Sequence, residues 1–150
     1  MKAVIQRVEH AAVHVSSNEI SSIQEGLLVL LGITHDDDEG DITWLVDKII
    51  KLRIFNDSDD KMNVSVMDAD GDILVVSQFT LHASTKKGNR PSYIEAARPE
   101  VAIPLYKKFI SQINQKCEKD IKTGEFGAMM KISLINDGPV TIIIDSKNRV

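Results

Sequence analysis

Seven consecutive residues, Gly26–Gly32 (Gly-Leu-Leu-Val-Leu-Leu-Gly), constrain the fold more than any other part of this chain. They are apolar at both odd and even positions, whereas a strand with one face in water alternates apolar with polar residues. The run is also far shorter than the roughly 18 apolar residues of a membrane span. We therefore predict a strand that is covered on both faces, in a sheet with protein layers on either side.

Two segments have the apolar spacing of helices that can cover such a sheet. One follows the acidic stretch His35–Asp41, with Asp41 as a suitable N-cap. The other follows Pro99. The predicted inward residues are Ile42, Leu45, Val46, Ile49 and Ile50 in the first helix, and Ala102, Leu105, Tyr106, Phe109 and Ile113 in the second.

Further strands are predicted on both sides of these helices. A hairpin that turns at Asp70-Gly71 would lead into a strand over Ile73–Phe79. The other predicted strands are Val4–Val8, Ala11–Val15, Met130–Ile135 and Val140–Asp145, with a short segment at Ile20–Gln24. We predict one α/β domain, residues 1–150, with a mixed sheet of about seven or eight strands and two main helices.

Charge and cysteine content exclude several classes of function. The net charge of −4 argues against a protein that coats DNA or RNA through bulk charge, but not against contact with one end of an RNA. The single cysteine, Cys117, cannot form an internal disulfide, which agrees with a reducing cytoplasm. The N-terminal sequence becomes polar too soon for a signal peptide. Neither a membrane nor DNA is a predicted partner.

The run His35-Asp36-Asp37-Asp38-Glu39 has the composition of a metal site. Adjacent residues point in different directions, however, and acidic residues are favourable at the start of a helix. We therefore predict a solvated loop and no metal. A metal-dependent hydrolase that uses Asp36–Asp41 remains the alternative.

Two polar segments are candidate sites. Ser77–Ala83 (Ser-Gln-Phe-Thr-Leu-His-Ala) ends an apolar strand and would gather hydroxyl, amide and backbone N–H groups at one rim of the sheet. Asn136–Thr141 (Asn-Asp-Gly-Pro-Val-Thr) places a Gly-Pro step between two strands, where the backbone can approach another body closely. Taken alone, each segment also fits an ordinary strand end or turn.

Together these segments resemble the D-aminoacyl-tRNA deacylase family, and the resemblance extends over nearly the whole chain. Met129 stands where we would expect a polar or acidic residue. The matching strings are Met1–Val8, Gly26–Gly32, Asp47–Ile49, Leu52–Phe55, Lys61–Asn63, Ser77–Leu81, Gly88–Ser92, Thr123–Ala128 and Asn136–Thr141.

The resemblance implies a homodimeric cytoplasmic enzyme with β/β/α layers and no metal or cofactor. It would hydrolyse the ester between a D-amino acid and the terminal adenosine of tRNA, a proofreading step in translation. The resemblance also implies that Gly138-Pro139 is cis and reaches into the partner subunit's site, opposite Ser77–Leu81. Arg7 matches a family position that holds this motif in orientation.

These implications agree with the chemistry of the residues present. Two carbonyl oxygens of the Gly138-Pro139 unit can receive the substrate's α-ammonium group while they fill the space that an L side chain needs. A D side chain would point outward and go unread. Glycine has no side chain to exclude, so we predict some hydrolysis of glycyl-tRNA.

The hydrolytic step has two possible routes. Thr80 can act as a nucleophile if a base such as His82 is positioned beside it. In the route we prefer, water attacks with help from the ribose 2′-hydroxyl, and N–H groups near Phe79 and Thr80 stabilise the oxyanion.

The remaining substrate contacts follow from the same resemblance. Ser77, Gln78 and Phe79 should contact the adenosine or the ester, with Leu81 beside them, and Ala102 and Met130 match positions that accept the adenine. Exposed cations Lys86, Lys87 and Arg90 fit phosphate contacts and plain solvated surface equally well. A non-catalytic protein that binds an RNA end or a metabolite on the same scaffold is the rival hypothesis.

Overall fold

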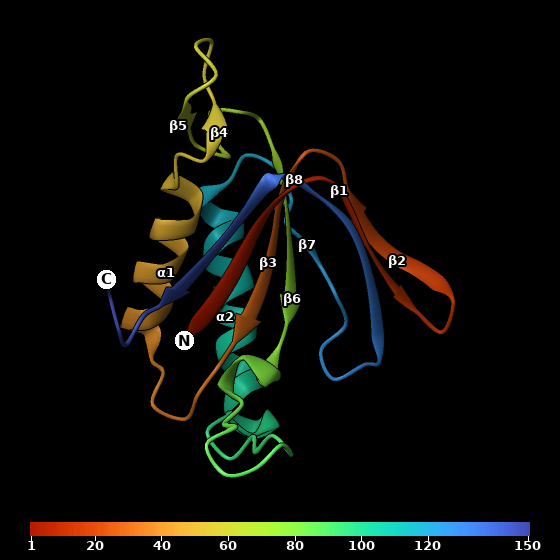
Figure 1. The fold of residues 1–150 in the computed structure, drawn as a ribbon, viewed down its shortest axis with the longest axis vertical. Coiled ribbons are helices and arrows are strands. Elements are labelled where there is room, and N and C mark those ends of the chain that lie inside the picture. Colours follow the sequence, from red (N-terminus) through yellow and green to blue (C-terminus); the bar gives the residue numbers. More distant parts are fainter.

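The computed structural model describes all 150 residues and contains eight strands, two long helices and one short 3₁₀ helix (Figure 1). The helices are α1 (Glu39–Lys51), α2 (Pro99–Lys116) and the 3₁₀ helix η1 (Phe79–His82). No helix combines the length and the apolar character that crossing a membrane requires. The strands are β1 (Lys2–Val15), β2 (Asn18–Ile23), β3 (Gly26–Gly32), β4 (Phe55–Asn56), β5 (Met62–Val64), β6 (Asp72–Ser77), β7 (Lys122–Thr123) and β8 (Met130–Asp145).

The main sheet is mixed, as the sequence predicts. Its strand order is β2-β1-β3-β6-β7, and β8 pairs with β1. The strand β1 runs antiparallel to β2, β3 and β8, whereas β3 and β6 are parallel, as are β6 and β7. A separate small hairpin, β4–β5, forms between α1 and β6.

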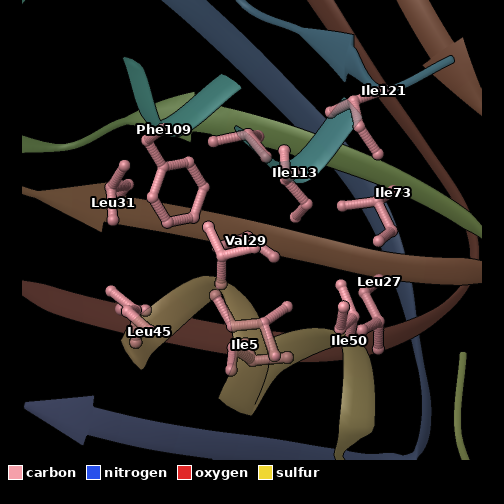
Figure 2. Close-up of a cluster of buried hydrophobic side chains, with 14 of the residues drawn as sticks. Ile5, Leu27, Val29, Leu31, Leu45, Ile50, Ile73, Phe109, Ile113 and Ile121 are labelled. Atoms are coloured by element: carbon pink, nitrogen blue, oxygen red, sulfur yellow. The ribbon is translucent and has the colours of Figure 1, made fainter. Parts of the chain in front are cut away.

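The strand β3 is buried on both faces, which confirms the first prediction. Leu27, Val29 and Leu31 belong to the larger core, where side chains of α1 and α2 pack on the sheet (Figure 2). Leu28, from the opposite face, belongs to a second core formed with β1, β2 and β6, against which Ile132 of β8 also packs. The fold thus has one helical layer and a second, strand-built layer around the central sheet.

Both helices bury the predicted faces, but α1 begins earlier than expected. Its N-cap is Asp38, not Asp41. The Asp38 side chain accepts a hydrogen bond from the Asp41 N–H (3.1 Å), and the Asp41 side chain accepts one from the Asp38 N–H (3.0 Å). This reciprocal capping box satisfies two N–H groups, which favours Asp38 as the first cap residue.

The predicted hairpin at Asp70-Gly71 is wrong. Residues 66–70 form consecutive turns, which the hydrogen bond from the Gly71 N–H to the Val66 carbonyl (2.9 Å) closes. The strand β6 then pairs in parallel with β3, and it ends at Ser77 instead of Phe79. A parallel partner is distant in sequence, so the local turn residues could not reveal it.

The first and last strands are each continuous where the sequence predicts two pieces. The pairing of β1 with β8 shifts register at two places, between Gln6 and Val8 and between Val8 and His10: Gln6 pairs with Thr141, Val8 with Asn136 and His10 with Ile135. Residues 137–140 of β8 therefore lie opposite Arg7 alone. These residues form a bulge. Together with the paired residues on either side, Asn136 and Thr141, we call it the Gly-Pro bulge (residues 136–141).

Candidate active site

A small pocket of about 80 Å³ lies where the parallel strands β3 and β6 end. Ser77, the last residue of β6, pairs with Leu31 of β3. Ligands of open sheets with parallel strands commonly bind at this edge, outside the carboxyl ends of the strands. The lining residues are Leu31, Ile33, Ser77, Gln78, Phe79, Ala97, Ala102, Phe126 and Gly127.

The segment Ser77–Leu81, which we call the site segment, leaves the sheet at the rim of this pocket. The Gln78 N–H donates to the Leu31 carbonyl (2.7 Å), and the Leu81 N–H makes the first hydrogen bond of η1, to the Gln78 carbonyl (3.3 Å). The N–H groups of Phe79 and Thr80 precede that bond, so they have no acceptor within the helix. They are therefore free to bind an oxygen atom of a ligand.

The Thr80 hydroxyl accepts a hydrogen bond from the Gln78 side-chain amide. His82 does not join them, because the chain is helical here and residues 80 and 82 do not share a strand face. The His82 ring is buried, and its Nε2 atom has no hydrogen-bond partner. Burial lowers the pKa of His82 below its usual 6.5. The structure thus does not place His82 as a base for Thr80.

Tyr106 of α2 lies behind the pocket and has a structural contact. Its hydroxyl donates to the Val75 carbonyl of β6 (3.2 Å), and its ring packs on Phe126 with centroids 5.5 Å apart. Burial raises the pKa of Tyr106 to about 12, so the hydroxyl stays protonated at neutral pH. Tyr106 therefore supports the pocket wall rather than supplying an acid or a base.

The other residues predicted around the substrate lie in different surroundings. Ala102 of α2 is buried and lines the pocket. Met130 does not line it in the isolated chain, because its Sδ atom packs over Gly124, only 2.7 Å from where a Cβ there would lie. Leu81 is half-buried beside Gly32. The predicted phosphate-binding cations Lys86, Lys87 and Arg90 are exposed on the loop after η1.

The Gly-Pro bulge carries Gly138 and Pro139 on the surface, joined by a cis peptide bond. Gly138 has a φ of +121°, in the region that favours glycine, and a Cβ there would meet Arg7 Nη2 and Val140 Cγ2, each at 2.9 Å. Within the bulge, the Asn136 side chain accepts from the Val140 N–H (2.9 Å). Both the backbone conformation and the space around it therefore require glycine.

Arg7 fixes the bulge from behind. This side chain is only 9% exposed, and its Nε donates to the Asp137 carbonyl (3.2 Å) and lies 3.2 Å from the Asp137 carboxylate. Its Nη1 donates to the Ile54 carbonyl (2.7 Å) and to Asn56 Oδ1 (3.2 Å). Arg7 thereby ties the bulge to the start of the β4–β5 hairpin.

In one chain, the bulge and the pocket lie near opposite ends of β3. Arg7, opposite the bulge, pairs with Leu27 near the start of β3, whereas the pocket begins at Leu31. Four residues of strand separate these positions by about 13 Å. Figure 1 shows the bend of β8 near β4 and β5, and the green turn of η1 at the far end of the sheet.

The acidic stretch at the start of α1 makes contacts within the protein. Asp37 is buried and pairs with the amino group of Met1, while Lys147 donates to Asp41 (2.7 Å). Burial acts to raise the pKa of Asp41, but hydrogen bonds from Lys147, the Asp38 backbone and Ser146 outweigh it and lower the value to about 2. No group of three or more histidine, cysteine or carboxylate side chains could hold a metal ion.

Sequence reasoning missed several residues around the pocket. Ala97 and Phe126 line it, and the ring of Tyr93 contacts Phe79 edge-on, with centroids 5.1 Å apart. Phe126 lies within a string that carries the family resemblance, which is the signal that could have singled it out. Tyr93 gives a weaker signal, as an aromatic residue in a polar loop.

Comparisons with known proteins agree with the resemblance. The sequence model of a family described as "D-Tyr-tRNA(Tyr) deacylase" matches residues 4–145. Proteins named D-aminoacyl-tRNA deacylase from Flavobacterium johnsoniae and Cytophaga hutchinsonii are 60% and 62% identical over 149 residues, covering 99% of each chain.

Solved structures show the same fold. One named "c-Myc DNA Unwinding Element Binding Protein" matches with a TM-score of 0.92 and 44% identity, over 97% of this chain and 98% of that one. Another, titled "Structural Analysis of a probable eukaryotic D-amino acid tRNA deacylase", matches with a TM-score of 0.80 over 95% and 97% of the two chains. At 17% identity, the second likeness concerns the fold alone.

Proposed function

This chain belongs to the D-Tyr-tRNA(Tyr) deacylase family and is a hydrolase of D-aminoacyl-tRNA, and we propose that two copies of it divide the reaction between the site segment of one and the Gly-Pro bulge of the other. The match over residues 4–145 carries the activity. The distance between the two motifs in one chain supports the proposal that two copies share the reaction. The products of the reaction would be the free D-amino acid and tRNA. The enzyme would thereby protect translation in the cytoplasm.

The need for a second copy follows from the distance between the motifs. About 13 Å of strand separates the bulge from the pocket in one chain, so a bulge that meets the ester must come from elsewhere. Gly138 and Pro139 are exposed and available to a partner. The strand β8 pairs only with β1 and exposes Ile135 (54%) and Ile143 (71%). We therefore propose a homodimer in which each bulge enters the other subunit's site.

Chirality would be sorted by the carbonyl oxygens of Gly138 and Pro139. These oxygens receive the substrate's α-ammonium group and occupy the space of an L side chain, whereas a D side chain points outward. Steric exclusion separates D-esters from L-esters well only if the excluding atoms cannot move away. The hydrogen bonds of Arg7 to Asp137, Ile54 and Asn56 supply this rigidity.

Glycyl-tRNA tests the exclusion mechanism because glycine has no side chain to exclude. We expect the enzyme to hydrolyse glycyl-tRNA measurably faster than L-alanyl-tRNA at the same enzyme concentration. Single-turnover assays of both esters measure this difference. Equal resistance of the two esters would contradict the proposed filter.

We propose that water, not a side chain, attacks the ester carbonyl. The N–H groups of Phe79 and Thr80 would stabilise the oxyanion, and the ribose 2′-hydroxyl would assist the attack. The bond between the carbonyl carbon and the ribose oxygen then breaks, and the ribose oxygen takes the proton that the attacking water gives up. A threonine nucleophile needs a positioned base, but the Thr80 hydroxyl contacts the Gln78 amide, and His82 is buried with no hydrogen bond to Thr80.

The remaining site residues would hold the end of the tRNA. We propose that Ser77, Gln78 and Phe79 contact the ester and the ribose. Leu81 would lie beside them and support them. Ala102 and Met130 would accept the adenine; Met130 must then leave its contact with Gly124 or act through the assembled dimer.

We further propose that Lys86, Lys87 and Arg90 bind phosphates of the acceptor stem. Removal of one cation that neutralises a phosphate reduces the slope of log affinity against log salt by about 0.7 to 0.9. The double substitution Lys86→Ala/Lys87→Ala should therefore lower the measured slope by about 1.5. An unchanged slope would show that these lysines are ordinary solvated surface. Lys107→Ala/Lys122→Ala, at two exposed lysines elsewhere, is the matched control.

One assay separates the proposed activity from its rivals. D-tyrosyl-tRNA and L-tyrosyl-tRNA are incubated with the enzyme, with and without EDTA. We expect rapid loss of the D-ester alone, unaffected by the chelator. Binding without turnover would indicate an RNA-binding module, and inhibition by EDTA would indicate a metal-dependent hydrolase. Sedimentation of the same protein tests the dimer.

A further inference from the structure

An exposed aromatic and apolar patch lies directly beside the pocket. The ring of Phe79 is on the pocket rim, and Tyr93 packs edge-on against it at 5.1 Å and an interplanar angle of 75°. Phe79 is 56% exposed, Tyr93 39% and Ile94 78%. Water thus covers large apolar side chains next to the place where the RNA terminus is proposed to end.

Hydrogen bonds on both sides hold the patch in place. The Ser84 and Ser92 backbones exchange two hydrogen bonds (2.8 and 2.9 Å), which close the loop just before Tyr93. Just after Ile94, the Thr34 hydroxyl donates to the Glu95 carbonyl (2.7 Å), and the Ala97 N–H donates to the Ile33 carbonyl (2.9 Å). The backbone of the patch is therefore anchored on both sides, so binding to it would order little additional chain.

The chain segment that contains Tyr93 and Ile94 carries a net positive charge, in a chain whose net charge is −4. Residues 84–98 contain four cationic side chains and one carboxylate, and none of these cations lies within ion-pair distance of an acid. By contrast, Lys108 and Lys116 of α2 each pair with a carboxylate of α1. The four cations are Lys86, Lys87, Arg90 and Arg98.

We propose that Tyr93 and Ile94, with the outer face of Phe79, form a platform for the unpaired bases that precede the terminal adenosine of the substrate RNA. This inference rests on the proposed function, which places that adenosine in the pocket. Unpaired bases stack on aromatic side chains in a sequence-tolerant way, and adjacent cations hold the backbone between them. Anchored aromatic rings, exposed apolar surface and unpaired cations together match that chemistry.

The platform would therefore bind the nucleotides that all substrate tRNAs share, whichever amino acid is attached. It would contribute to tRNA affinity and not to the hydrolytic step. A substrate that ends at the adenosine would not reach it. This difference between a long and a short substrate separates the platform from the pocket.

The test compares full-length D-tyrosyl-tRNA with the minimal ester D-tyrosyl-adenosine in single-turnover assays. Tyr93→Ala should raise the enzyme concentration needed for half-maximal rate on the tRNA by about tenfold, the scale of one base stack. Its effect on the minimal ester should stay within twofold. Tyr93→Phe, which keeps the ring, should behave as wild type on both substrates. Ile94→Ala, at a more exposed position, should give a smaller effect in the same direction.

Three outcomes would overturn the platform. Equal losses on both substrates would mean that Tyr93 acts through the pocket, and no loss on either would mean that it is plain surface. A change in sedimentation with Tyr93→Ala would mean that the patch is an interface between copies of this chain. Failure of the wild-type enzyme on both esters would instead contradict the proposed function itself.

Discussion

The two motifs of this enzyme are held in very different ways. The Gly-Pro bulge is fixed by a buried arginine that bonds Asp137 on one side and the Ile54 carbonyl on the other. The site segment is attached to the sheet through the Gln78 N–H, and it exposes more than half of Phe79. The Gly-Pro bulge is therefore fixed by a buried side chain, whereas the site segment is exposed at the rim of the pocket.

This difference fits the tasks we propose for them. A body that excludes the wrong mirror image must not move, because a displacement of about 1 Å changes reaction rates by about 100-fold. A segment that binds the ester through its backbone N–H groups instead acts on the oxyanion of any ester that the bulge admits. We therefore expect substitutions at the bulge to change selectivity and substitutions in the site segment to change rate.

The strongest test of this comparison is Gly138→Ala. The positive φ and the two contacts at 2.9 Å force the bulge or Arg7 to move. We expect the ratio of D- to L-tyrosyl-tRNA hydrolysis to fall by about 100-fold or more in single-turnover assays. Gly88→Ala is the matched control, because its φ is +76° but nothing lies within 4 Å of the added Cβ. Unchanged selectivity in Gly138→Ala would remove the bulge from the mechanism.

Arg7→Ala should give the next largest effect. It leaves the Ile54 carbonyl and the bulge without their donor, so we expect a loss of about 1–3 kcal/mol in the free energy of unfolding. Selectivity should fall by about tenfold while the rate on the D-ester falls less. Denaturant titration and paired D and L assays measure the two effects. A stability loss with full selectivity would show that Arg7 supports the fold alone.

Thr80→Ala tests the other motif. If water is the nucleophile, the single-turnover rate should fall less than about tenfold, because only the hydrogen bond with Gln78 is removed. A fall of about three orders of magnitude would restore a threonine nucleophile. Selectivity should stay intact in either case, in contrast to Gly138→Ala.

The smallest expected effect concerns His82, which directly follows the site segment in the chain. Its folded pKa is below 6.5 because the ring is buried, so the unfolded chain binds more protons as pH falls through 6.5. Wild-type stability should therefore decrease from pH 7.5 to pH 5.5, and it should decrease less in His82→Gln. Denaturation midpoints at the two pH values provide the measurement. Parallel profiles would show that His82 has no such role.

The sequence predicted those parts of the fold that depend on local patterns. The apolar residues of Gly26–Gly32 predicted a doubly covered strand, and the helical spacing after Pro99 predicted the buried face of α2 correctly. The hairpin at Asp70-Gly71 failed, because turn residues do not show that β6 pairs in parallel with a strand far back in the chain.

The candidate site shows the same limit. Both motifs were identified from their strings, but no local signal shows that they lie near opposite ends of β3, because the register of β8 on β1 and of β1 on β3 decides this. Nor could spacing predict that residues 79–82 turn into a helix and remove His82 from Thr80. Tyr93 became a candidate only when its ring was found against Phe79.

The placement of the two motifs at opposite ends of β3 has a genetic consequence under the proposed dimer. A chain damaged only in the bulge still offers an intact pocket, and a chain damaged only at Thr80 or Phe79 still offers an intact bulge. When both defective chains are made together, each mixed dimer contains one centre in which the pocket and the bulge are both intact. Production of the two defective chains together would then restore, in each mixed dimer, one centre with both normal rate and normal selectivity, which is half of the wild-type number of centres.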